Sequence, residues 1–337
     1  MKYLASLVLT LFVTGSIHCI FTREPAPTPT STFNYMWSAI NEKYALFGYK
    51  CLNWDSVKTK YQSMINDDMS DDRLFVVLSM MLDELKDGHA NLQSSFNRSR
   101  SWDWFLDFPQ NYNRTIQQRN YLGRDYMITG GIEHRMIDSV GYLYIPSFEK
   151  PITDKDVDYI LNRYKNSSGL IIDIRNNGGG NAKNIFRLAS RIVDEKIYVY
   201  SSWFKNGPGA DDFGKEIKVS VEPSSRIHYK GTVIVLTNRA CYSAANRFAA
   251  VFSLLPDVII IGDKTGGGGG TPCFVELPNG WYVRFSAMKT LRADGYNIDE
   301  GINPDIPAEI TPEDEAKGID TIIERALLEI RNRRKQR

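Results

Sequence analysis

The chain has 337 residues, of which 42% are hydrophobic and 24% are charged. This length and composition are those of a globular protein with one large or two modest domains. Its 41 basic and 40 acidic residues leave a formal net charge of +1, so no bulk attraction favours nucleic acid and we expect no nucleic-acid partner. Four cysteines are too few for a disulfide framework. The histidines and cysteines lack metal-ligand spacing, so we expect neither a metal nor an organic cofactor.

The first 19 residues, MKYLASLVLTLFVTGSIHC, have the order of a secretory signal peptide: a lysine, an apolar run, then small and polar residues. The apolar run is too short to span a bilayer. A Pro/Thr-rich linker follows over residues 20–32. We therefore expect an exported protein of the periplasm or cell surface. Cys19 is either a lipidation site that tethers the mature chain to a membrane or an incidental cysteine.

Residues 33–90 carry apolar side chains at helical spacing and predict a helical N-terminal subdomain of three helices. The third helix starts near Ser70 and ends in the sequence LKDGHANL, where a glycine breaks it. His89 therefore lies on a turn.

Residues 91–139 are rich in aromatic side chains and show little periodicity. They predict a small irregular β region of short strands and loops. The aromatic side chains from Trp102 to Tyr121 either pack over the core or line a substrate groove.

Residues 140–312 predict an α/β core. The strand VGYLYIP is followed by a capping-box pattern at Thr153 and Asp156, which starts a helix, and then by the continuous apolar run GLIIDI. Such runs are typical of strands covered by helices on both faces, so we expect a right-handed parallel crossover. The sequence RNNGGGN comes next. Its glycines either turn the chain or let backbone N–H groups face a phosphate or an oxyanion.

A second motif lies between Gly231 and Gly270, where a strand, a serine, a helix, another strand and five glycines follow one another. Ser243 stands where the strand passes into the helix. A helix N-terminus stabilises an anion beside such a hydroxyl, as a nucleophile needs. Serine is also favoured as a plain N-cap, so both interpretations stay open. Cys241 and Cys273 flank the helix and glycine segments and are either bridged or two free thiols.

The end of the core carries a hairpin signal and an acidic loop. The turn at Asn279 and Gly280 is of the Asn-Gly type that joins antiparallel strands. A proline-bounded loop, YNIDEGINPDIP, follows. Residues 313–337 predict a C-terminal helix with a basic end.

Five motifs occur in a fixed order over about residues 80–310: LKDGHANL, LIIDIRNNGGGN, CYSAANRFAAVF, IIGDKTGGGGG and EGINPDI. Together they resemble the tail-specific, or C-terminal processing, serine peptidases, most closely the tricorn-like Ser/His branch. The resemblance implies a crotonase/ClpP-like α/β core of sheet and helices, an N-terminal helical subdomain and a serine-type peptidase without a cofactor. Many members carry a PDZ domain, but the roughly 50 residues between His89 and Val140 are too few for one.

The resemblance assigns roles to individual residues. Ser243 matches the nucleophile, His89 the general base and Glu300 the acidic residue that supports the base. The implied oxyanion hole is formed by backbone N–H groups, namely those of Ala244 and Gly179, with Gly178 as the second choice.

Two positions depart from the family pattern. Tricorn-like members have a serine directly before the histidine, where this chain has Gly88. Glu300 therefore reaches His89 directly, through another hydroxyl or through water. Members with a Ser/Lys dyad place their lysine at the position of Gly268, and Lys264 is the alternative base in this chain.

The sequence therefore predicts an exported serine endopeptidase that cleaves a peptide or protein substrate through an acyl-enzyme at Ser243, with His89 as base. Two alternatives stay open: a non-catalytic ligand-binding protein on the same scaffold, and a Ser/Lys hydrolase that uses Lys264. The oligomeric state does not follow from the sequence.

Overall fold

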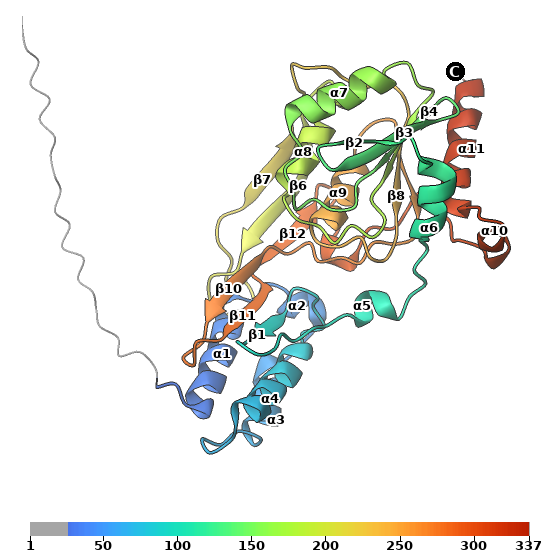
Figure 1. The fold of residues 1–337 in the computed structure, drawn as a ribbon. Helices are drawn as coiled ribbons and strands as arrows, with labels where there is room; N and C mark the ends of the chain where they lie inside the picture. Colours follow the sequence, from blue (N-terminus) through green and yellow to red (C-terminus); the bar gives the residue numbers. More distant parts are fainter. Residues whose placement is uncertain (1–25, 337) are drawn as a thin grey trace, which may run out of the picture.

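The structure is a computed structural model that describes residues 26–336. It has the expected α/β fold: a seven-stranded sheet with helices on both faces, joined to a smaller helical part (Figure 1). The predicted signal peptide and Cys19 lie outside the described residues. Within residues 26–336, no helix is both long enough and apolar enough to cross a membrane.

The large sheet contains seven strands, which in chain order are β2 (Met127–Thr129), β3 (Ile132–Ile137), β4 (Val140–Tyr144), β5 (Leu170–Asp173), β8 (Val233–Thr237), β9 (Val258–Gly262) and β13 (Ile306–Pro307). In space they are ordered β13-β9-β8-β5-β4-β3-β2. Strands β4, β5, β8, β9 and β13 run parallel, and β2 and β3 add an antiparallel edge. The predicted parallel pairing of the first two core strands is confirmed by β4 and β5.

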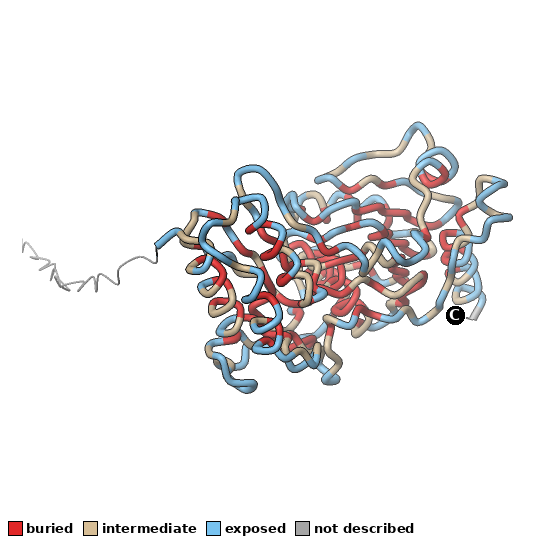
Figure 2. The backbone as a smooth tube through the Cα atoms, turned by 90° about the horizontal axis from the view of Figure 1, so that it is seen from below, coloured by how far each residue is buried: buried red, intermediate tan, exposed pale blue. Residues whose placement is uncertain are grey.

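The parallel strands are buried on both faces. Along β8, Val233 and Val235 face one hydrophobic core, whereas Ile234 and Leu236 face the other. The first core is covered by α7 (Asp154–Tyr164), α8 (Lys183–Ala189) and α9 (Ala244–Phe252). The second is covered by α6 (Arg114–Ile116), the π-helical segment η1 (Gln117–Leu122) and α11 (Thr321–Gln336). Figure 2 shows the buried backbone running through the middle of the molecule.

The helical part combines the beginning of the chain with a hairpin from much later in the sequence. Its helices are α1 (Pro29–Lys43), α2 (Phe47–Lys50), α3 (Trp54–Gln62) and α4 (Asp71–Asp83). They pack against a small sheet of β1 (Asn91–Gln93), β11 (Tyr282–Ser286) and β10 (Pro272–Glu276), in that order. The predicted Asn-Gly hairpin is confirmed, because β10 and β11 pair antiparallel on either side of Gly280.

A third sheet connects the two parts. It contains β6 (Ile197–Phe204), β7 (Ile217–Val221) and β12 (Met288–Arg292), in the order β12-β6-β7. Strand β12 follows β11 after the single residue Ala287, so the chain passes directly from the helical part to this sheet. Ser286, at the end of β11, is fully buried at this junction.

Two segments differ from the sequence prediction. Over residues 103–122, helix α5 (Asp103–Leu106), α6 and η1 replace the expected short strands. Asn113 caps α6, because its Oδ1 atom accepts hydrogen bonds from two N–H groups of that helix. The expected single C-terminal helix is divided into α10 (Pro312–Ala316) and α11. Gly318 breaks it at φ +74°, and Asp320 accepts hydrogen bonds from the first turn of α11.

Candidate active site

Ser243 lies at the sharp turn between β8 and α9. Its φ is +57° and its ψ is −118°, a conformation that is strained for a residue with a side chain. Backbone bonds hold the turn: the Ser243 N–H donates to the Gly267 carbonyl at 3.0 Å, and the Ser243 carbonyl accepts from the Arg247 N–H at 2.9 Å. The side chain makes no capping hydrogen bond to α9. The N-cap interpretation therefore lacks its defining contact, and the hydroxyl is left without that partner.

The glycine loop, residues 178–180, lies beside Ser243. It follows β5, as Ser243 follows β8, so both segments stand at the carboxyl ends of neighbouring parallel strands. Gly179 has φ +103°, and a Cβ atom there would lie 2.8 Å from Ala244 N and 2.9 Å from Ser243 Cβ. Only glycine fits so close to the nucleophile turn.

Asn177 fixes the glycine loop and decides which N–H groups are available. Its Oδ1 atom accepts from the Gly179 N–H at 2.8 Å, and its carbonyl accepts from the Tyr242 N–H at 3.1 Å. The N–H groups of Gly178 and Ala244 have no hydrogen-bond acceptor within residues 26–336. The Gly179 N–H, which the sequence favoured as an oxyanion donor, is therefore already bonded to Asn177. The Gly178 N–H, the second choice for that role, has no acceptor within residues 26–336.

His89 lies on the turn between α4 and β1, as predicted, and is buried. Its Nδ1 atom is 3.3 Å from Ser286 Oγ, and its Nε2 atom has no hydrogen-bond partner among the described residues. Burial lowers the pKa of His89 to about 4, although attraction to Asp87 acts in the opposite direction. The imidazole is therefore neutral near neutral pH, with one ring nitrogen free to accept a proton.

Asp87 supplies the negative charge beside His89. Its Oδ1 atom accepts from the His89 N–H at 2.8 Å and from the Tyr242 hydroxyl at 3.2 Å. Burial acts to raise the pKa of Asp87, but attraction to His89 and Lys50, the hydrogen bond from the His89 N–H and the nearby Ser286 hydroxyl lower it. The Oδ2 atom of Asp87 is buried and has no hydrogen-bond partner within residues 26–336. Ser286 therefore lies close to both the His89 ring and the Asp87 carboxylate.

Tyr242 occupies the space beside both Gly88 and Gly268, the two positions at which this chain departs from the family pattern. Its ring stacks on Trp104, with centroids 4.1 Å apart, and meets the His89 ring edge-on at 4.9 Å. A Cβ atom on Gly88 would lie 2.6 Å from Trp104 Nε1 and 2.9 Å from the Tyr242 hydroxyl, so a serine does not fit before the histidine. A Cβ atom on Gly268 would lie 2.3 Å from Tyr242 Cζ, so a lysine does not fit there. The tyrosine fills the space that both side chains would need.

Glu300 is not brought to the histidine. It ends the short 3-10 helix η2 (Ile298–Glu300) and is exposed to solvent. Its charge acts on the hydroxyls of Tyr49 and Tyr296, and it makes no contact with His89 within the described chain.

The preceding residue, Asp299, has the carboxyl group whose charge acts on Asp87, although it does not line the cavity. Its Oδ1 atom accepts from the Gly270 N–H at 3.2 Å, and its buried Oδ2 atom has no partner among residues 26–336. Burial, followed by repulsion from Asp87, raises the pKa of Asp299 to about 7. The sequence resemblance assigned the supporting acidic role to Glu300. Its neighbour Asp299 differs from it in the direction of its side chain.

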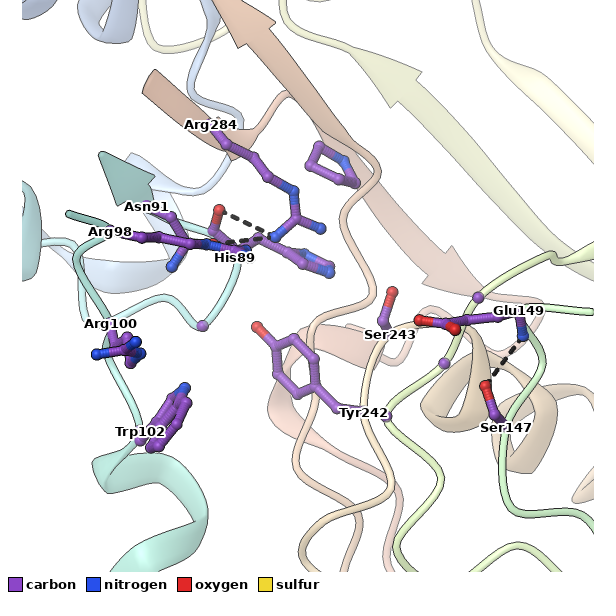
Figure 3. Close-up of a pocket in the computed structure, with 15 residues that line it drawn as sticks. His89, Asn91, Arg98, Arg100, Trp102, Ser147, Glu149, Tyr242, Ser243 and Arg284 are labelled. Atoms are coloured by element: carbon purple, nitrogen blue, oxygen red, sulfur yellow. Dashed lines mark hydrogen bonds between the residues drawn. The ribbon is translucent and has the colours of Figure 1, made fainter. Parts of the chain in front are cut away.

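Ser243 and His89 line one cavity of about 630 Å³ together with the glycine loop (Figure 3). The two side chains lie on different sides of the cavity, and no hydrogen bond joins them in the described chain. Catalytic hydrogen bonds are often long before a substrate binds. The cavity therefore holds a nucleophile candidate, a neutral base and free backbone donors around one space.

Other candidate groups lie outside this cavity. Lys264 is not among its lining residues. Cys241 and Cys273 are both free thiols, and Cys241 is buried, with its Sγ 2.9 Å from the Ile174 carbonyl oxygen. Within residues 26–336, no group of three or more His, Cys, Asp or Glu side chains is arranged to hold a metal ion.

The described site can be compared with known protein families. A family model described as peptidase family S41 matches residues 139–308, about half of the chain. The chain belongs to peptidase family S41. This match covers the glycine loop, Ser243 and Asp299. A second model, the tricorn protease C1 domain, matches residues 25–83. His89 lies between the two matched ranges, and the resemblance inferred from the motifs is confirmed.

Individual S41 relatives agree with this assignment. A crystal structure of a candidate peptidase from Parabacteroides merdae is 43% identical, has a TM-score of 0.86, and covers 90% of this chain and 96% of its own. The carboxy-terminal processing protease CtpA of Bacillus subtilis is 30% identical over 175 residues, which are 51% of this chain and 36% of CtpA. The tricorn protease of Thermoplasma volcanium is 24% identical over 66% of this chain and 20% of its own length. The chain spans about a third of the CtpA-like relatives.

Proposed function

We propose that this chain is a serine endopeptidase that hydrolyses peptide bonds through an acyl-enzyme at Ser243. One observation carries the proposal: the Ser243 hydroxyl, which makes no capping hydrogen bond, and the His89 Nε2 atom, which has no hydrogen-bond partner within residues 26–336, line the same cavity. Buried polar groups normally find partners, and backbone strain is kept where function requires it. Membership of family S41, whose members are serine-type peptidases, supports the same reaction.

In the first half of the reaction, Ser243 Oγ attacks the substrate carbonyl carbon while its proton passes to His89 Nε2. The carbonyl oxygen becomes an oxyanion held by the Ala244 and Gly178 N–H groups. The imidazolium then gives the proton to the departing amine as the C–N bond breaks. In the second half, His89 takes a proton from water, whose oxygen attacks the acyl carbon. The imidazolium returns that proton to Ser243 Oγ as the ester C–O bond breaks and the carboxylic acid product leaves.

Ser286 and Asp87 hold His89 in the form that this reaction needs. The assigned tautomer has Nδ1 protonated and donating to Ser286 Oγ, and the Asp87 carboxylate lies close by. This arrangement leaves the Nε2 lone pair free, and the Asp87 carboxylate stabilises the imidazolium. Support of the base by Glu300 stays a prediction, and Asp87 is better placed for that role.

We also infer that the protein is exported and acts on peptides or proteins outside the cytoplasm. Residues 1–19 have the order of a secretory signal, and Cys19 is the candidate for a lipid anchor. Intact mass of the mature chain from an envelope fraction tests both points. A mature N-terminus at Cys19 with a diacylglycerol mass supports the anchor, whereas a full-length chain starting at Met1 contradicts export.

The acyl-enzyme is tested by intact mass after treatment with a fluorophosphonate probe, which labels activated serines. Wild type is compared with Ser243→Ala, His89→Ala and Lys264→Ala. One adduct that is lost without Ser243 or His89 and kept without Lys264 is the expected result.

Two other results would change the assignment. An adduct that ignores His89 and needs Lys264 favours the Ser/Lys hydrolase. Folded wild type without any adduct contradicts the acyl-enzyme and favours the non-catalytic binding protein.

A further inference from the structure

The cavity that contains Ser243 carries an uneven charge. Its lining includes three arginines, Arg98, Arg100 and Arg284, which lie on the side of His89 (Figure 3). Among the lining residues, Glu149 is the one carboxylate, and it lies on the side of Ser243. The buried imidazole is neutral near neutral pH, so the positive charge on the His89 side comes from the three arginines.

Two of these guanidinium groups converge on a neutral acceptor. Arg98 Nη2 and Arg284 Nη1 both donate to Asn91 Oδ1, each at 3.2 Å, and Arg284 also donates to the His89 carbonyl at 3.4 Å. None of the three arginines forms an ion pair with a carboxylate of residues 26–336. Burial and repulsion from Arg98 lower the pKa of Arg284, although attraction to Tyr242 and Asp87 acts in the opposite direction. The two cations therefore repel each other, and neither is paired with a carboxylate of residues 26–336.

The two buried arginines among residues 26–336 are neutralised by carboxylates. Arg175 is fully buried and forms ion pairs with Asp173 and Asp320, at 2.7 and 3.0 Å. Arg191 is also buried and pairs with two carboxylates of α7. A charge that leaves water is normally neutralised in this way. The cavity arginines differ: Arg98 and Arg100 are exposed to solvent and Arg284 is half-buried, so they need no internal partner and are free to meet an anion that enters the cavity.

We propose that Arg98, Arg100 and Arg284 bind a carboxylate of the peptide substrate, either an acidic side chain near the scissile bond or a free C-terminus. The proposal rests on the proposed peptidase function, since the same cavity contains the nucleophile. Guanidinium groups bind carboxylates through paired N–H donors, and they lose less hydration than an ammonium does. Glu149 repels such a group from the Ser243 side, so the carboxylate lies toward His89.

The test measures binding to the Ser243→Ala variant, so it does not depend on turnover. Fluorescein-labelled alanine-rich peptides carry one central Glu, Gln or Lys, each with a free or an amidated C-terminus. Fluorescence anisotropy gives their affinities at low and at raised salt. Each added carboxylate that reaches the arginines is expected to tighten binding by about ten- to hundredfold, less so at raised salt.

Charge-removing substitutions locate the effect. In the Ser243→Ala background, Arg98→Gln and Arg284→Gln should each reduce the ratio of carboxylate to neutral affinity by about tenfold. Lys264→Gln removes one positive charge outside the cavity and is the matched control, which should keep the ratio. Because the ratio is taken within one variant, a general loss of affinity does not imitate the effect.

Each outcome decides the question. A preference for the Glu peptide assigns an acidic side chain, and a preference for the free C-terminus assigns the chain end. Equal affinities, no binding at all, or a preference that survives both arginine substitutions overturns the proposal. Fluorophosphonate labelling of wild type reports separately on the acyl-enzyme, so the failure of one proposal is distinguishable from that of the other.

Discussion

The two sides of the cavity are built by different means. On the nucleophile side, Ser243 and the glycine loop are held by backbone hydrogen bonds at the ends of neighbouring parallel strands. On the base side, His89 is held by side chains from distant segments, above all Ser286 and Tyr242. The first side depends on shape and backbone conformation, the second on charge and protonation. The two sides should therefore fail in different ways when they are altered.

The largest effect is expected on the nucleophile side, from Gly179→Ala. The added Cβ would lie 2.8 Å from Ala244 N at a φ of +103°, so we expect a loss of about 3 kcal/mol or more in unfolding free energy. Gly178→Ala is the matched control, since a Cβ there meets nothing within 4 Å and should change stability by less than about 0.5 kcal/mol. Denaturant unfolding measures both. Equal stability of the two variants would show that the glycine loop shifts to accommodate the added methyl group, which contradicts the prediction.

On the base side, the sharpest comparison is Asp87→Asn against Glu300→Gln. Loss of the buried negative charge beside His89 should slow fluorophosphonate labelling by about hundredfold, because the imidazolium loses its stabilising partner. The exposed Glu300 makes no contact with His89, so its variant should differ from wild type by less than about twofold. A larger loss of labelling rate in Glu300→Gln than in Asp87→Asn would show that Glu300, and not Asp87, supports the His89 base.

The pH dependence of labelling tests how deeply the base is buried. A neutral imidazole is the active form, so a pKa of about 4 keeps His89 active down to about pH 5. An unperturbed imidazole would already lose about thirtyfold in rate at that pH. The same shift means that His89 stabilises the fold above pH 6.5 and that this contribution is lost as the pH falls toward 4. A labelling midpoint near pH 6.5 would contradict the buried base.

A further comparison concerns Asp299, whose pKa is raised from 3.8 to about 7. A carboxyl group with a raised pKa stabilises the fold while protonated, and that contribution is lost as the pH rises through 7. Asn cannot ionise, so the stability of Asp299→Asn relative to wild type should rise by about 3–4 kcal/mol between pH 4 and pH 8. Denaturant titrations at a series of pH values measure the difference. A pH-independent difference would mean that Asp299 is ionised throughout.

The sequence predicted the features that depend on local patterns. Continuous apolar runs identified the parallel strands, and a strand followed by a serine and small residues identified the Ser243 turn. Asp87 is only two residues from His89, but the other partners did not follow from the sequence, because they are far away along the chain: Ser286 lies 197 residues from His89, and Tyr242 lies 155 residues from Asp87. No local pattern encodes such contacts.

The sequence also could not decide between adjacent residues that differ only in the direction of their side chains or N–H groups. The spacing of the acidic loop singled out Glu300, whereas the adjacent Asp299 is the residue with a buried carboxylate oxygen. In the glycine loop, the choice between two N–H groups was decided by the side chain of Asn177, which engages Gly179. A sequence gives the segment that reaches a site, but the rotation of each side chain is set by packing.

The ion pairs of Arg175 have a consequence for biosynthesis. Arg175 lies three residues before the glycine loop, and one of its two carboxylate partners, Asp320, lies at the start of α11. While the chain is still being made, the segments of Ser243 and the glycine loop emerge well before residue 320. Until then, Arg175 lacks one of its two carboxylate partners, and its burial is unfavourable. Stable burial of this arginine therefore has to wait until nearly the whole chain has been synthesised.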